Sequence, residues 1–209
     1  DPDLKYLREV NAKYGSEDYL VLTYTPKENL LNPSTIKNLT NLKNDLTNLK
    51  WVSSVITILD VPLLKNNDDP LAERIKNFKT LSSEDADKER GYDEIINSPI
   101  YKEFIISKDG NTSAIAVYIK NDKKMSDLII TKNDYLNKIE NKKLSSEEDV
   151  KYKKFLKNYD NYKKLYNQKN HNNINEIREV IKKYNNTAKI HLGGIPMIAD
   201  DMMTYVKND

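Results

Sequence analysis

The chain has 209 residues, of which 38% are hydrophobic and 32% are charged, so its hydrophobic core must be thin for its length. A chain of this size forms one large domain or two small ones. A formal net charge of +2 argues against a nucleic-acid-binding surface, which needs an excess of basic residues. The absence of cysteine excludes disulfides, thiolate zinc sites and cysteine nucleophiles. The apolar runs are far shorter than the roughly 20 residues of a membrane-spanning helix.

The first third of the chain predicts two helices and two strands. Apolar residues at three- and four-residue spacing predict a helix over 1–14, and a β-branched and aromatic run predicts a strand over 19–24. Asn32 has the position of a side-chain cap for a helix whose apolar stripe extends to Leu49. Residues 51–59 predict a second strand.

The middle of the chain is more polar. Residues 65–97 contain one short amphipathic piece around Leu71, Ile75 and Phe78. The apolar runs 104–106 and 114–119 flank an Asp-Gly turn, which predicts a β-hairpin.

A highly charged helical region then extends to residue 170. Ser145 and Glu148 have capping-box spacing for its second helix. An aromatic stripe follows on that helix, formed by Tyr152, Phe155, Leu156, Tyr159, Tyr162 and Tyr166. Two interpretations of the stripe are a slot for a lipid or sugar and helix-on-helix packing, and packing is favoured because aromatic stripes at helical spacing usually form core.

The chain ends with a helix over 174–184, a strand over 188–192, a break at Gly193-Gly194 and a further amphipathic segment. Without the polar insertions, the order is strand, helix, strand, repeated once. This is the split βαβ, or ferredoxin-like, order of an α+β fold. We therefore expect a four- or five-stranded, mainly antiparallel sheet with helices on one face, and helical inserts at 65–103 and 121–170.

No catalytic, cofactor-binding or metal-binding constellation is recognisable. The two histidines are His171, in a predicted Asn-rich loop, and His191, in the last predicted strand, and neither lies in a hydrolase motif. The acidic clusters lack the spacing of a calcium loop, and Gly193-Gly194 lacks the Lys-Ser or Lys-Thr of a phosphate loop. We therefore expect a domain that is not an enzyme and needs no cofactor.

Three stretches resemble the first large extracytoplasmic loop of RND-superfamily exporters of the MMPL/Patched-like type. They are DPDLKY at 1–6 with YGSEDYLV at 14–21, VSSV at 52–55 with LDVPLL at 59–64, and LGGIPMIADDM at 192–202. The match is in order and spans nearly the whole chain, and the two charged inserts match least. The chain begins without Met or a leader, and we expect either a removed signal peptide or a segment of a longer protein.

The resemblance implies a division of the chain. Residues 1–15 would be a connecting helix after a transmembrane segment, 16–194 a ferredoxin-like porter domain, and 195–209 the lead-in to the next transmembrane helix. The family-motif residues, taken as structural and membrane-proximal, are Asp60, Pro62, Gly193, Gly194, Pro196, Asp200 and Asp201. The proton-carrying acids of this family lie in transmembrane helices, so Asp200 and Asp201 are interpreted as helix-start acids near the membrane surface.

The function implied is that of a porter domain in a proton-driven exporter, which holds or channels a hydrophobic or lipid-like substrate without catalysis. Its partners would be the transmembrane helices and the second extracytoplasmic loop of the same chain, and not nucleic acid; a homo-oligomer of the parent is left open. The location would be the periplasmic side of an inner membrane. The alternative is an extracytoplasmic ligand-sensing domain of a membrane receptor, which would have its own closed pocket. A secreted enzyme is the weakest option.

Overall fold

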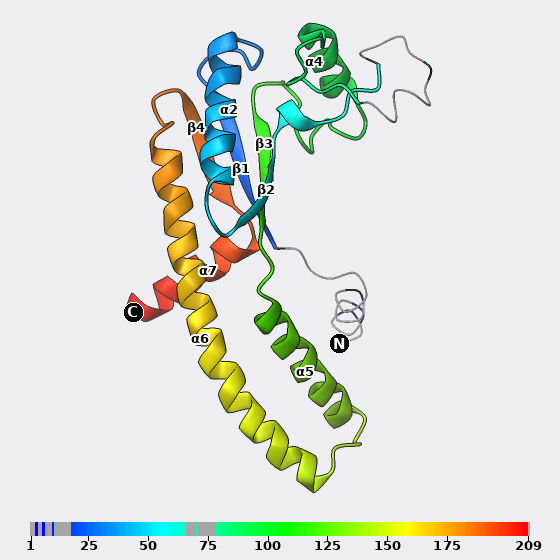
Figure 1. The fold of residues 1–209 in the computed structure, drawn as a ribbon, viewed down its shortest axis with the longest axis vertical. Helices are drawn as coiled ribbons and strands as arrows, with labels where there is room; N and C mark the ends of the chain where they lie inside the picture. The colour runs from blue at the N-terminus through cyan, green and yellow to red at the C-terminus, as the bar shows by residue number, and fades with distance from the viewer. Residues whose placement is uncertain are drawn as a thin grey trace. The chain divides into compact units, whose positions relative to one another are not determined.

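The computed structural model describes residues 18–65 and 78–208, together with Asp3, Tyr6, Val10 and Pro70 (Figure 1). The chain forms two compact units. One consists of residues 19–119 and 174–209 and contains the sheet, and the other consists of residues 1–18 and 120–173. Of the helix predicted over 1–14, only Asp3, Tyr6 and Val10 are described, and all three are helical.

The sheet has the predicted ferredoxin-like order. Its strands are β1 (Tyr19–Pro26), β2 (Val52–Ile56), β3 (Ser113–Ile119) and β4 (Ala188–Gly193). They lie in the order β2-β3-β1-β4, and all three pairings are antiparallel. Helix α2 (Pro33–Thr47) joins β1 to β2, and the end of helix α6 (Ser146–Lys182) precedes β4. The α+β fold class and the four-stranded antiparallel sheet are therefore confirmed.

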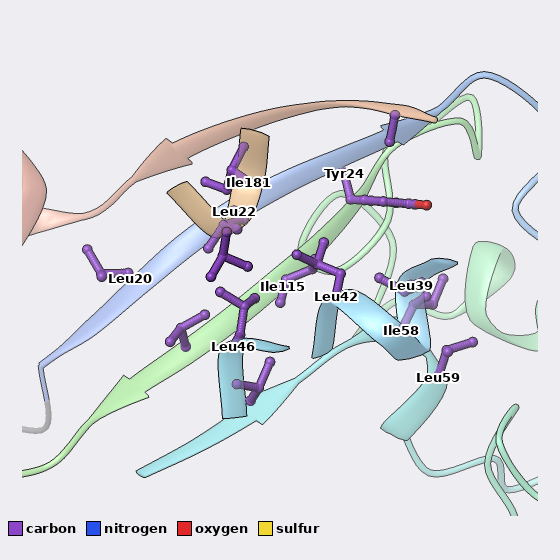
Figure 2. Close-up of a cluster of buried hydrophobic side chains, with 14 of the residues drawn as sticks. Leu20, Leu22, Tyr24, Leu39, Leu42, Leu46, Ile58, Leu59, Ile115 and Ile181 are labelled. Carbon is purple, nitrogen blue, oxygen red and sulfur yellow. The ribbon is translucent and has the colours of Figure 1, made fainter. Parts of the chain in front are cut away.

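The core lies between one face of this sheet and the helices α2 and α6. Alternate residues of β1 point into it, and Leu20, Leu22 and Tyr24 are each 0% exposed. Figure 2 shows side chains of α2, α6, β1 and β3 gathered in one cluster. The helical members are Leu39, Leu42 and Leu46 of α2 and Ile174, Ile177, Val180 and Ile181 of α6.

Helix α2 begins where the sequence predicts. The Asn32 side chain accepts a hydrogen bond from the Ser34 N–H at 2.9 Å, and Pro33 occupies the first turn, where its missing N–H has no cost. The stripe predicted on this helix is the face that packs on the sheet.

The predicted strand over 51–59 is wrong at its end. Strand β2 stops at Ile56, and Ile58–Asp60 forms the short 3-10 helix η1. Thr57 and Asp60 form a capping box, in which the Asp60 carboxylate accepts hydrogen bonds from the Thr57 N–H and hydroxyl at 2.8 Å each. These local side-chain bonds replace the cross-strand bonds that would have continued the strand.

The predicted β-hairpin around Asp109-Gly110 is half right. The turn exists and Gly110 has φ of +72°, but residues 104–106 do not form a strand. They are joined to the start of β3 by a single bridge between Ile106 and Ser113. Strand β2 pairs only with residues 116–119 of β3, so β2 leaves this edge of β3 free at 113–115. The segment does not extend along it because the N–H groups of residues 104–106 donate to the Tyr101 carbonyl in a local turn.

Helix α4 (Lys88–Asn97) was not predicted; the Asp87 side chain caps it by accepting a bond from the Arg90 N–H at 3.0 Å. The amphipathic piece expected around Leu71, Ile75 and Phe78 falls mostly outside the described residues, and Phe78 itself is not helical.

The predicted break between the charged region and the last helix does not exist. Helix α6 continues from Ser146 to Lys182, so His171 lies in a helix and not in an Asn-rich loop. Asparagine has only a modest helix penalty, and the apolar residues that follow it are packed on the sheet, which keeps the last turns of the helix in place.

The second unit contains helix α5 (Lys123–Glu140) and residues 146–173 of α6. The predicted capping box is confirmed, because Ser145 N–H donates to the Glu148 carboxylate and Glu148 N–H donates to the Ser145 hydroxyl. The aromatic stripe packs against α5, as favoured: the Tyr135 ring lies 4.9 Å from the Tyr152 ring and 5.7 Å from the Phe155 ring. The five aromatic residues of the stripe recur at alternating intervals of three and four residues, which is the spacing of a coiled-coil seam.

Leu42 tests the packing of α2 on the sheet. Leu42→Ala should lower the free energy of unfolding by about 2–5 kcal/mol, because the residue is fully buried and its truncation removes buried apolar contacts. Asn41→Ala, on the exposed side of the same helix, should change it by less than about 0.5 kcal/mol. Denaturant unfolding measures both, and equal effects would contradict this packing.

The lowered pKa of Glu148 predicts that the hairpin of α5 and α6 loses stability in acid. The hydrogen bond from Lys138, together with those from Ser145, lowers the pKa of Glu148 from 4.5 to about 2. A carboxylate with a lowered pKa stabilises the fold above its unfolded value, so this stabilisation should be lost as the pH falls from about 4.5 to about 2. Circular dichroism should show Glu148→Gln losing part of that pH dependence. The Glu147 carboxylate pairs with the exposed Lys151, so the control variant Glu147→Gln should retain the pH dependence.

Candidate functional site

The sheet face opposite the helices carries no buried residue. It is formed by alternate positions of the four strands, and we call it the open face. Its residues are Ser54 and Ile56 of β2, Ala114, Ala116 and Tyr118 of β3, Tyr19, Val21, Thr23 and Thr25 of β1, and Lys189, His191 and Gly193 of β4.

The middle of the open face is apolar. The strand registers align Ile56, Ala116, Val21 and Gly193 in one row across the sheet. Two of these four residues are Ala and Gly, so another backbone or a planar molecule could approach the sheet closely here. Ile56 is 41% exposed although it is a large aliphatic residue.

The two ends of the open face differ. At one end the rings of Tyr19 and Tyr118 lie 5.9 Å apart, and Tyr19 is 50% exposed. At the other end the hydroxyl groups of Thr25 and Thr112 share a hydrogen bond of 2.8 Å. Lys189 is the only residue of the face with a formal charge, whereas 32% of the whole chain is charged. Solvent exposure favours charged side chains, so it does not explain why this face has only one.

Gly194 makes the turn from β4 into helix α7 (Ile195–Asn208). Its φ is +116°, a conformation that residues with a side chain rarely adopt. A Cβ at this position would lie 3.0 Å from the Tyr19 carbonyl oxygen, so α7 can leave the sheet edge here only because residue 194 is glycine. Pro196 occupies the first turn of α7, where its missing N–H is tolerated.

Helix α7 has an exposed apolar stripe. The stripe consists of Ile195, Ile198, Met202, Tyr205 and Val206, which are 53–81% exposed and recur at helical spacing. On the other side of the helix, Met197 packs on the core and Asp200 is 2% exposed. A polar anchor fixes this orientation, since Arg178 of α6 and Asp201 form an ion pair of 2.6 Å. The apolar side of α7 therefore faces away from the core.

Asp200 and Asp201 are not helix-start acids. Helix α7 begins at Ile195 and has no acidic residue in its first turn. The helix begins directly after the glycine break, so both aspartates fall in its second turn. Both side chains serve packing: Asp200 is buried, and Asp201 pairs with Arg178.

Asp60 and Pro62 also have structural contacts. Asp60 caps η1 and forms an ion pair with Lys43 of α2. The Pro62 carbonyl accepts a hydrogen bond from the Tyr101 hydroxyl at 3.1 Å. Together they attach the end of β2 to α2 and to the segment before β3. Sequence reasoning named these positions but did not identify their partners, which come from distant parts of the chain.

Within residues 18–65 and 78–208, no group of three or more His, Asp or Glu side chains could hold a metal ion. His191 lies on the open face and His171 on α6, in different units of the chain. Among the described helices, none is both long and apolar enough to cross a bilayer.

Sequence reasoning missed the open face. The period-two pattern of β1 and β3 was visible, but Thr, Ala and Ser on alternate positions could face either solvent or a partner. No family model and no curated protein matches this chain.

Gly194 and Gly193 form a matched pair for a test. Gly194→Ala should lower the free energy of unfolding by about 1–3 kcal/mol, because it combines a positive φ with a close backbone contact. Gly193→Ala should cost less, since its Cβ would lie 3.7 Å from the Val21 carbonyl, an ordinary contact. Thermal unfolding of both variants distinguishes them, and a larger loss for Gly193→Ala would contradict the geometry of this turn.

Proposed function

We propose that this chain is an extracytoplasmic porter domain of a proton-driven exporter of the RND superfamily, MMPL/Patched-like type. Its role is to hold or channel a hydrophobic or lipid-like substrate by moving against the rest of the transporter, without catalysis. The observation that carries the proposal is the open face, a nearly uncharged surface on a ferredoxin-like sheet. The sequence resemblance supplies the family.

The composition of the open face supports docking. A protein with about one charged residue in three, exposing a sheet face with a single charged position, has a surface fitted to another protein surface or to an apolar molecule. In the proposed transporter, the second extracytoplasmic loop covers this face.

The stripe on α7 supports the same proposal independently. Five exposed apolar residues on one side of a helix form a surface that is normally buried in an assembly. In the exporter, this stripe packs on the membrane-proximal part of the transporter, and the Arg178–Asp201 ion pair holds the helix in the required orientation.

A ligand-sensing domain is the alternative, and it requires an enclosed pocket with convergent polar groups. A surface hollow on α6, lined by residues 151–161, is open to solvent, so it does not meet this requirement.

The sequence of the parent gene is the first test. The exporter predicts an apolar stretch of about 20 residues before Asp1, several such stretches after Asp209, and a second similar loop later in the chain. One apolar stretch on each side, with a cytoplasmic signalling module, would make the domain a sensor. A signal peptide before Asp1 and a stop codon after Asp209 would contradict both.

Ile56 tests the open face in the intact parent protein. Ile56→Lys should lower the efflux of a hydrophobic dye several-fold, because it places a charge in the centre of the docking surface. The isolated domain should lose less than about 1 kcal/mol of stability, since Ile56 is exposed on an edge strand. Ser53→Lys adds the same charge to another exposed position of β2 and should leave efflux unchanged. Equal efflux from the two variants would argue against docking at this face.

A further inference from the structure

The charges of the chain are unevenly distributed. Residues 120–173, which form the hairpin of α5 and α6, contain 14 of the 34 basic residues and 8 of the 32 acidic residues. This segment carries a formal charge of +6, and the rest of the chain carries −4. The net charge of +2 for the whole chain is therefore the sum of a basic hairpin and an acidic remainder.

The positive charge is concentrated on the outer side of α6. From Val150 to Asn172 there are seven lysines and one acidic residue, Asp160. The exposed side of α6, which borders the aromatic stripe at Phe155, carries four of these lysines, and we call it the lysine face: Lys151, Lys154, Lys157 and Lys164. By helical rise, the face is about 20 Å long and one helix wide.

Three consecutive acids of the hairpin form ion pairs within it. Glu147 and Glu148 pair with Lys151 and Lys138, and Asp149 pairs with Lys153. In the part of the chain that the structure describes, no ion pair joins Lys154, Lys157 or Lys164 to a carboxylate. Three ammonium groups of one face thus remain available to an outside partner.

The lysine face also has a hollow. Its volume is about 540 Å³, and it is lined by Lys151, Lys154, Phe155, Lys157, Asn158 and Asn161. Its wall is chiefly apolar, because the Phe155 ring and the methylene stems of the lysines form it. The hollow can therefore receive an apolar side chain while the ammonium groups around it meet carboxylates.

We propose that the lysine face binds an acidic helical segment of another protein, with carboxylates at three- and four-residue spacing and one apolar side chain seated in the hollow. A helix aligned along α6 has the same rise per residue, so its carboxylates keep in step with the lysines. This binding does not depend on the proposed exporter function.

The charge and shape of the lysine face do not suit a second copy of this face, a lipid surface or a nucleic acid. Two copies of this chain cannot pair through their lysine faces, because faces of the same sign repel. A lipid surface is planar and would not enter the hollow, and it would meet a basic strip only one helix wide. Nucleic-acid sites favour arginine for its forked contacts with phosphate, and residues 120–173 contain no arginine.

The test uses the full chain and a synthetic helical peptide of about 20 residues, long enough to span the face. The peptide carries Glu at three- and four-residue spacing and one central Leu. A control peptide has Gln in place of Glu. Calorimetric titration should show binding of the Glu peptide that weakens as salt is added, and no binding of the Gln peptide.

Lys154→Glu/Lys157→Glu/Lys164→Glu should weaken binding at least about tenfold. The matched control is Lys27→Glu/Lys102→Glu/Lys108→Glu, which makes the same charge change at exposed positions of the sheet unit. If the reversed hairpin fails to fold, the neutral variant Lys154→Gln/Lys157→Gln/Lys164→Gln gives the same comparison. Asn158→Trp, which fills the hollow without changing charge, should also weaken binding.

Four results would overturn the proposal. They are no binding of the Glu peptide, an equal loss of binding in the two triple variants, no effect of Asn158→Trp, and tighter binding of anionic phospholipid vesicles or of a single-stranded oligonucleotide than of the peptide.

Discussion

The packing of α2 and the end of α6 on one face of the sheet is the constraint on which the rest of the structure depends. Leu42 and Leu46 of α2 and Ile177 of α6 are fully buried with the inward residues of β1 and β3. Burial of apolar area is the main favourable term in folding, and this chain has little apolar area to bury. The main buried cluster lies on one face of the sheet. No described element of the sheet unit covers the other face.

Because the open face is not covered by the described part of the chain, its composition indicates whether it faces solvent or a partner. An uncovered sheet face ordinarily carries polar residues at alternate positions along its whole length. Here its centre is a row of small and aliphatic residues, Ile56, Ala116, Val21 and Gly193. The outward stripe of α7 repeats the pattern on a helix. Both surfaces have the composition of contacts that a partner completes.

The hairpin of α5 and α6 has the opposite surface chemistry. Its internal contact is an aromatic seam, held at its ends by hydrogen bonds such as that from the Tyr162 hydroxyl to Asp122. Burial alone would raise the pKa of Asp122, but the bonds from Met125 and Tyr162 and the charge of Lys169 lower it. Aromatic side chains supply the packing between α5 and α6, and lysine side chains cover the exposed surface of the hairpin. The two units thus offer an apolar and a basic surface from one chain.

The sequence by itself determined the features that depend on near neighbours along the chain. The Asn32 cap, the Ser145–Glu148 capping box and the strand periodicity of β1 are local, and the element order was enough to predict a ferredoxin-like sheet. The tertiary structure decided what depends on distant partners. It carried α6 through its asparagines by packing its last turns on the sheet. The end of β2 at Ile56 and the turn at 104–106 come instead from local bonds, to Asp60 and to the Tyr101 carbonyl, which sequence reasoning missed. The tertiary structure also decided which side of α7 faces outward, because Arg178, far from Asp201 in the sequence, binds the acidic side of the helix.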